Sequence, residues 1–184
     1  MKHKVLLVGA STGGPTQIKE MLSSITSLSC TVIIAQHMRE EVLPFFINDL
    51  KESLSIKIVS TPLKTNLDEP SVIICAQTCV LQETASGYEI VNDTKDQHYT
   101  PDINKLFNSF VNFSSDFDLR VLIMTGIGSD GVDGAKNLKS HGAKVFAQNE
   151  KSSPVYGMPR VAIESGIVDE IQTFDEIKEC FRSL

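Results

Sequence analysis

The sequence predicts an α/β fold: one doubly wound, three-layer domain with a mostly parallel sheet and an antiparallel hairpin at one edge. Three short runs of apolar residues rich in β-branched types, at 5–8, 31–35 and 121–124, are each followed by a helical pattern. Strands that alternate with helices pair in parallel, because each helix crosses back over the sheet. Two later runs joined by Ser86-Gly87 are typical of a hairpin.

Length and composition favour one domain. The chain has 184 residues, 41% of them hydrophobic, and a formal net charge of −6. We expect a single catalytic domain over residues 1–184, with a substantial core. The acidic balance, without a cluster of Lys or Arg, argues against nucleic-acid binding. No secretory signal precedes the first strand and no apolar run is long enough to span a bilayer, so we expect a cytoplasmic protein without membrane insertion.

The four cysteines predict a reduced protein. Cys30 and Cys75 lie in or beside apolar strands, where a buried free thiol is the usual state. Cys75 and Cys79 form a pair without a matching second pair, which is weak evidence for zinc. We therefore expect no metal and no cofactor.

The first half of the chain is predicted to run strand, helix, strand, helix. The first helix starts near Pro15, and its apolar positions recur at helical spacing on one face. Residues 31–35 are too few for a helix and form the second strand. The pattern at 39–54 contains Pro44, so that helix either begins near Leu43 or kinks.

The middle of the chain is predicted to hold short strands and the hairpin. The strands are expected at 56–59 and 72–75, separated by the polar segment 61–70. The hairpin pairs 80–82 with 88–91. A polar loop then leads to a helix that Pro101-Asp102 opens.

The C-terminal part is predicted to continue the strand–helix alternation. After the strand at 121–124 come a helix at 132–140, a strand at 144–147 and a polar loop. A helix at 158–164 and a short strand near Ile167-Val168 follow. Thr173 or Asp175 caps the last helix.

The segment 9–14, Gly-Ala-Ser-Thr-Gly-Gly, places Ser11 in a G-x-S-x-G motif between a strand and a helix. Gly9 and Gly13 allow the sharp turn that exposes the hydroxyl, and the free amides of the next helix stabilise negative charge beside it. A short motif of this kind also suits a loop that binds phosphate. The motif alone favours neither a nucleophilic serine nor a phosphate-binding loop over the other.

Two further strand ends favour the nucleophile. The strand at 31–35 is followed by His37, and the strand at 121–124 leads to a Gly-rich turn that carries Asp130. Ligands bind at the carboxyl ends of the strands in such sheets. The sequence therefore predicts a triad of Ser11 as nucleophile, His37 as base and Asp130 as the acid that orients the base.

Competing residues have simpler explanations. His3 lies near the terminus, His98 in a polar loop, and His141 at a helix end that favours a cation. Asp133 falls in the first turn of a helix, where an acid is a good dipole partner. Asn149 and Glu150 also follow a strand end, and a polar loop explains them equally well.

Donors to an oxyanion are expected at the same edge of the sheet. The backbone amides of Thr12 and Gly13 begin the helix after Ser11, and the Ile127-Gly128 turn supplies a second set.

Four motifs together resemble the chemotaxis protein-glutamate methylesterases. They are the segment 9–14, Gln-His-Met at 36–38, Thr-Gly-Ile-Gly-Ser-Asp-Gly at 125–131, and Ala-Gln-Asn-Glu with Val-Tyr-Gly-Met-Pro at 147–159. The resemblance implies the triad Ser11, His37 and Asp130. It further implies hydrolysis of glutamate methyl esters on the cytoplasmic helices of methyl-accepting chemoreceptors, in chemotaxis adaptation, with deamidation of receptor glutamines.

The chain departs from that family's pattern at several places. Ile127 stands where members usually have Met, residues 75–79 replace an Ala-Pro-Gly turn followed by His, and the segment 98–102 lacks an arginine. These changes bear on recognition of the receptor and leave the triad unchanged. Many members carry an N-terminal receiver domain; this chain starts at the catalytic strand, so we expect activity without phosphorylation.

Two alternatives from other classes stay open at this stage. A nucleotide- or phosphate-binding module would use the Gly-rich turn, but the chain lacks the lysine of a P-loop and the third-glycine spacing of a dinucleotide fold. A catalytically silent receptor-binding protein is the other.

Overall fold

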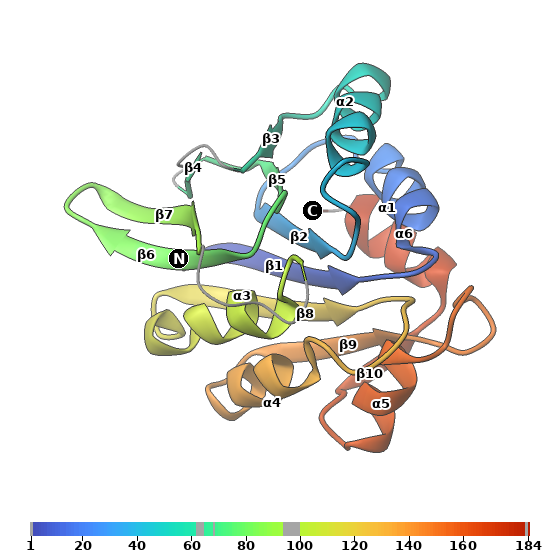
Figure 1. Ribbon diagram of the computed structural model, residues 1–184. Helices are drawn as coiled ribbons and strands as arrows, with labels where there is room; N and C mark the ends of the chain where they lie inside the picture. The colour runs from blue at the N-terminus through green and yellow to red at the C-terminus, as the bar shows by residue number, and fades with distance from the viewer. Residues whose placement is uncertain (1, 62–64, 68, 94–99, 183) are drawn as a thin grey trace.

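A seven-stranded sheet runs through the centre of the molecule, and every pair of neighbouring strands in it is parallel (Figure 1). In this computed structural model the described residues are 2–61, 65–67, 69–93, 100–182 and 184. The strands, in spatial order, are β10 (Glu170–Gln172), β9 (Lys144–Gln148), β8 (Phe117–Ile123), β1 (His3–Ala10), β2 (Thr31–Gln36), β5 (Val72–Ile74) and β3 (Ile58–Ser60). The predicted α/β class and the mostly parallel sheet are confirmed.

Helices cover both faces of this sheet (Figure 1). One layer consists of α1 (Gly14–Ser23), α2 (Leu43–Ser53) and α6 (Phe174–Arg182). The other consists of α3 (Ile103–Ser109), followed by the 3-10 turn η1 (Val111–Phe113), with α4 (Val132–Ser140) and α5 (Met158–Glu164). This is the three-layer arrangement that the strand–helix alternation predicts.

Each central strand contributes to two cores because its successive side chains point to opposite faces. In β1, Val5 and Leu7 belong to the core beneath α3 and α4, whereas Leu6 and Val8 belong to the core beneath α1 and α6. A strand buried on both faces reads as an unbroken apolar run, which is the pattern of residues 5–8.

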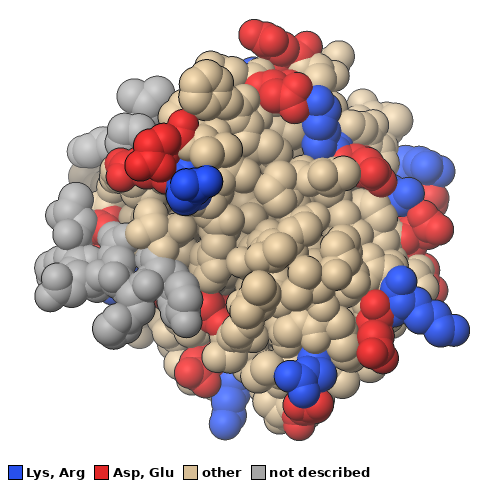
Figure 2. All heavy atoms as spheres, turned by 45° about the vertical axis from the view of Figure 1, so that its right-hand side comes forward, with Lys and Arg blue, Asp and Glu red and all other residues tan. Residues whose placement is uncertain are grey.

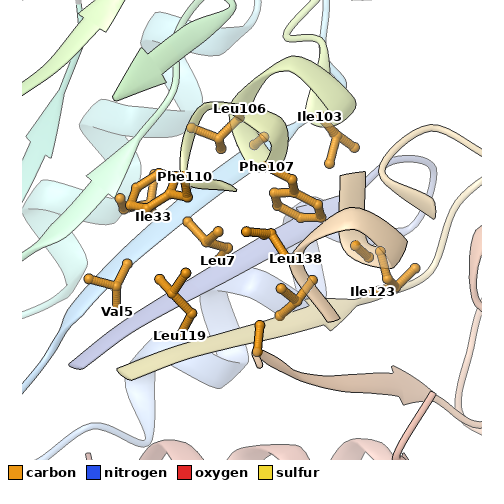
Figure 3. Packing of buried hydrophobic residues seen from close by; sticks show 14 of the residues in the cluster. Val5, Leu7, Ile33, Ile103, Leu106, Phe107, Phe110, Leu119, Ile123 and Leu138 are labelled. Carbon is orange, nitrogen blue, oxygen red and sulfur yellow. The ribbon is translucent and has the colours of Figure 1, made fainter. Parts of the chain in front are cut away.

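Phe107 of α3 belongs to the first core, where its ring faces the Leu7 and Leu138 side chains in Figure 3, and it is fully buried. Phe107→Ala removes a ring that the surrounding side chains cannot replace, so we expect it to lower the free energy of unfolding by about 3–5 kcal/mol. Urea denaturation followed by circular dichroism measures this loss. Phe45→Ala is the matched control, because Phe45 is 76% exposed; we expect a change within about 0.5 kcal/mol. Equal losses in the two variants would contradict this description of the core.

A second, antiparallel sheet stands beside the first (Figure 1). Its order is β4 (Thr65–Asn66), β7 (Gly87–Asn92) and β6 (Cys79–Thr84). The predicted hairpin is the β6–β7 pair, which turns between Thr84 and Gly87. The strand β4 pairs with β7, so the hairpin belongs to a small sheet of its own.

Several element bounds differ from those predicted. The helix α2 begins at Leu43, so Pro44 occupies the first turn and no kink is needed. The prediction of a strand near Ile167-Val168 was wrong: β10 begins at Glu170. Ile167 is buried in the core without pairing in the sheet, while Ile171 of the edge strand β10 is 52% exposed. The prediction placed the strand at the apolar pair because apolar residues are typical of strands, but here the buried apolar residue precedes the strand that pairs in the sheet.

Two helix caps in the C-terminal region follow known rules. The Oγ1 atom of Thr173 accepts a hydrogen bond from the Glu176 backbone amide, and Glu176 accepts one from the Thr173 amide. This reciprocal pair is a capping box, and it selects Thr173 over Asp175 as the cap of α6. At the end of α4, Gly142 has φ +95°, as expected of a C-terminal glycine.

All four cysteines are free thiols, and Cys30, Cys75 and Cys79 are buried. Cys79 donates to the Gln77 carbonyl and to Thr61 Oγ1, so its side chain faces the interior. Among the described residues no group of three or more His, Cys, Asp or Glu side chains is arranged to bind a metal. Within the same residues, no helix is both long and apolar enough to cross a bilayer.

Candidate active site

Ser11 follows the central strand β1 and stands at the carboxyl edge of the sheet. The backbone amide of Ser11 donates to the Thr125 carbonyl (2.9 Å), and its own carbonyl accepts from the Gly14 amide (2.9 Å). Gly13 adopts φ +85° in the turn, a conformation that L side chains rarely take. The turn is therefore held from both sides, and the Ser11 side chain is 9% exposed.

His37 and Asp130 come from the two strands that flank β1. His37 directly follows β2, and Asp130 lies in the turn between β8 and α4. The His37 Nε2 atom lies 2.7 Å from Asp130 Oδ2, and both side chains are largely buried. The His37 amide also donates to the Ala10 carbonyl (2.9 Å), which joins it to the residue before Ser11. The structure thus brings the three predicted residues to one edge, with the His–Asp pair in contact.

The start of α3 binds the Asp130 carboxylate. The Ile103 amide donates to Oδ2 (2.9 Å) and the Asn104 amide to Oδ1 (3.0 Å). Asp102 caps the same helix by accepting from the Lys105 amide. Burial raises the pKa of the Asp130 carboxyl, but the hydrogen bonds from His37 and from these two amides outweigh burial, and the net effect lowers the pKa. Asp130 is held as a carboxylate.

The competing residues lie elsewhere. His3 contacts Thr31 through Nε2, and His141 contacts the Asn137 carbonyl at the end of α4. His98 lies outside the described residues. Asp133 is exposed in the first turn of α4.

Asn149 and Glu150 belong to the loop after β9. The Asn149 Oδ1 atom accepts from the Ser152 amide and hydroxyl, and Glu150 is exposed. Asn149 therefore shapes its own loop, as its polar-loop interpretation predicted.

Two backbone turns that carry the expected oxyanion donors lie next to Ser11. Thr12 and Gly13 form the turn, and across from them Gly126 packs so closely that a Cβ there would lie 2.7 Å from Ser11 Cβ. Ile127 and Gly128 follow directly, with Gly128 at φ +89° and Ile127 66% exposed. The described residues form backbone hydrogen bonds in turns, loops and caps. The amides of Thr12, Gly13, Ile127 and Gly128 are donors in none of these bonds.

An open cavity of about 500 Å³ adjoins the 127–129 turn, and Tyr156 and Arg160 line its other side. A second cavity, of about 260 Å³, lies between α2 and the 75–79 segment, where Glu40 and Gln77 meet. These two lining residues are joined by a hydrogen bond from Gln77 Nε2 to Glu40 Oε1 (3.1 Å). Of the departures at 75–79, Ala76 and Gln77 line this cavity, whereas Cys75, Thr78 and Cys79 are buried.

Sequence reasoning missed two polar residues at this edge. Gln36, the last residue of β2, donates through Nε2 to the carbonyls of Ser11 and His37. Thr125 donates through Oγ1 to the Thr12 carbonyl (2.8 Å) and accepts from the Val155 amide. Both side chains are buried. The available signal was their position, because a polar residue at the buried end of a parallel strand needs a hydrogen-bond partner.

The fold and the position of the site define the class: a doubly wound α/β domain with its site at the carboxyl edge of the sheet. A family model described as CheB methylesterase matches residues 6–181. The chain belongs to the CheB methylesterase family.

Relatives named protein-glutamate methylesterase/protein-glutamine glutaminase are similar over most of the chain. The protein from Saccharophagus degradans is 30% identical over 95% of this chain and 48% of its own length. The one from Lawsonia intracellularis is 31% identical over 97% of this chain and 51% of its own length. This chain therefore spans about half the length of the curated relatives it matches.

The fold is also shared with the CheB methylesterase catalytic domain of Thermotoga maritima. The superposition covers 98% of each chain with a TM-score of 0.85, at 21% sequence identity.

Proposed function

We propose that this chain is a serine hydrolase that demethylates glutamate methyl esters on the cytoplasmic helices of methyl-accepting chemoreceptors and deamidates receptor glutamines at the same site. The observation that carries the proposal is the His37–Asp130 hydrogen bond of 2.7 Å beside Ser11, in a chain of this family. The same pair favours a nucleophile over a phosphate-binding loop, because a phosphate loop has no need of a base.

The proposed reaction follows from the orientation of the imidazole. With Nε2–H donating to the Asp130 carboxylate, Nδ1 is the basic nitrogen that takes the Ser11 proton. The Ser11 oxygen attacks the ester carbonyl, and the imidazolium returns the proton to the departing methoxide, which leaves as methanol. Water then cleaves the acyl-enzyme by the same proton transfers and yields glutamate. Glutamine follows the same route, with ammonia as the leaving group.

The surface around the site suits a neutral side chain. Figure 2 shows the face at which the strands end, and charged side chains gather at its periphery and leave the centre uncharged. Ile127, which follows Gly126 beside Ser11, is apolar and 66% exposed. A methyl ester and a glutamine amide are both neutral, whereas the product is a carboxylate, so such a surface favours substrate over product.

The direct test is incubation of the protein with receptor fragments that carry methyl-labelled glutamates. We expect labelled methanol from the wild-type protein and none above background from Ser11→Ala. Ammonia release from unmodified fragments tests deamidation in parallel. Methanol release by Ser11→Ala at the wild-type rate would refute the covalent mechanism.

Gly13→Val tests the amides of the Ser11 turn. Gly13 has φ +85°, and a Cβ there would lie 2.7 Å from Pro154 Cβ and 3.0 Å from Thr125 Oγ1. Displacing the turn moves the Thr12 and Gly13 amides away from the oxyanion, so we expect kcat to fall by about 10²–10³. The rate of methanol release at saturating substrate concentration measures kcat.

Gly142→Val is the matched control for that change. Gly142 also has positive φ, at +95°, but a Cβ there meets nothing within 4 Å, and the residue follows the C-cap of α4. We expect it to cost stability and leave kcat near the wild-type value. If Gly13→Val retains the rate of this control, the donors lie elsewhere.

A further inference from the structure

We propose that Gln36 is a positioning residue that sets the spacing between Ser11 and His37. The inference rests on the proposed function, since it assigns a role within that catalytic site. It goes beyond the triad and the oxyanion donors because Gln36 acts through the main chain of both residues and touches no reacting atom.

One side-chain amide holds the nucleophile and the base at once. Gln36 Nε2 donates to the Ser11 carbonyl at 2.9 Å and to the His37 carbonyl at 2.7 Å. The side chain is 1% exposed, so water does not compete for these bonds. The strand ends are otherwise joined here by the hydrogen bond from the His37 amide to the Ala10 carbonyl. Gln36 adds the link that reaches Ser11 itself.

The orientation of this amide follows from its two acceptors. The opposite orientation would place Oε1 against two carbonyl oxygens, which have no hydrogen to donate. In the observed one, Oε1 is buried and has no hydrogen-bond partner among the described residues. Buried polar atoms without partners are uncommon in folded proteins. The fold thus leaves one acceptor unsatisfied while both donors stay on the carbonyls of Ser11 and His37.

Gly14 provides the space for this side chain. A Cβ on Gly14 would overlap Gln36 Oε1 and lie 2.9 Å from Gln36 Cδ. The next nearest atom, Ala10 Cβ, would be 3.1 Å away, a contact that a small shift relieves. The backbone of Gly14 is not in the left-handed region, so the Gln36 side chain is the main obstacle to a larger residue.

Gln36→Met tests the proposal because it keeps a side chain of similar length and removes both donors. We expect the rate at which a fluorophosphonate labels Ser11 to fall about 10–100-fold, as for a small misplacement of reacting groups. In methanol release, we expect kcat to fall by the same factor and KM to stay within about twofold. Gln36→Asn, whose amide is one methylene short of the two carbonyls, should show the same loss and serves if the Met variant fails to fold.

Gln172→Met is the matched control. Gln172 is also a buried glutamine, but it lies in the edge strand β10 and donates to Glu170. We expect its labelling rate and kcat to match the wild type. Thermal unfolding of all variants separates positioning from stability: a fall in Tm without a change in kcat or labelling of the folded protein would overturn the inference. Absence of labelling in the wild type would instead contradict the proposed function.

A double-mutant cycle gives an independent test. Gly14→Ala alone should displace the Gln36 amide and lower the labelling rate by about the same factor as Gln36→Ala. In the Gln36→Ala background the obstacle is gone, so adding Gly14→Ala should change the rate by less than about twofold. Losses that simply multiply would show that the two residues act separately and would overturn the proposal.

Discussion

Replacing Ser11 or His37 with alanine should lower kcat by about 10⁴ or more, because each change removes an essential member of the proposed triad. Without Ser11 no acyl-enzyme forms, and without His37 no group takes the proton of the attacking hydroxyl. The two losses should not add in the double variant, since the residues act as one unit. Methanol release from methyl-labelled receptor fragments measures all three rates.

Both variants should stay folded. The Ser11 turn is held by its backbone amide and carbonyl, which Ser11→Ala leaves in place. His37→Ala removes the imidazole donor to Asp130 and leaves the amides of Ile103 and Asn104. Circular dichroism spectra and the Tm of each variant test whether it is folded.

His141→Ala is the matched control for the histidine. Its side chain is exposed at the end of α4, so we expect wild-type turnover. Near-normal turnover in Ser11→Ala would rule out the covalent mechanism, and near-normal turnover in His37→Ala would require another base.

Asp130→Asn should lower kcat by about 10³–10⁴, because the amide cannot accept at every position that the carboxylate serves. One Asp130 oxygen accepts from His37 and Ile103, and the other accepts from Asn104. In either orientation an asparagine places an NH₂ group against an N–H donor. The imidazole then loses its alignment or α3 loses a bond at its start. Asp133→Asn, the exposed neighbour in α4, should stay within about twofold of the wild-type rate.

The stability contributed by Asp130 should depend on pH, and Asp130→Asn tests this. Hydrogen bonds lower the pKa of Asp130 in the folded protein below its unfolded value of about 3.9. Such a group stabilises the fold above the unfolded pKa, and this contribution is lost as the pH falls through the folded pKa. We therefore expect the difference in unfolding free energy between wild type and Asp130→Asn to be largest near neutral pH and to shrink below about pH 4. Urea titrations across this range measure it, and a constant difference would contradict the assignment.

The arrangement of the sheet edge could be predicted only in part. The sequence predicts Ser11, His37 and Asp130 because each follows a buried apolar strand, and strand ends in a parallel sheet converge. The contact between His37 and Asp130 joins residues 93 positions apart and depends on the strand order, with β1 between β2 and β8. The role of Gln36 could not be predicted, because it depends on carbonyl positions that no local sequence pattern encodes.

Short-range chemistry controls the features that can be predicted from local sequence: the alternation of strands and helices, the turn at Gly13, the start of the last helix near Thr173 or Asp175, and the residue types at the strand ends. Periodicity and turn preference act over a few neighbouring residues, so they can be read along the chain. The tertiary structure alone decided the order β10-β9-β8-β1-β2-β5-β3, the position of β10, the binding of Asp130 by the start of α3 and the bridge made by Gln36. These depend on hydrogen bonds and packing between distant segments, whose partners become neighbours only when the whole sheet has assembled.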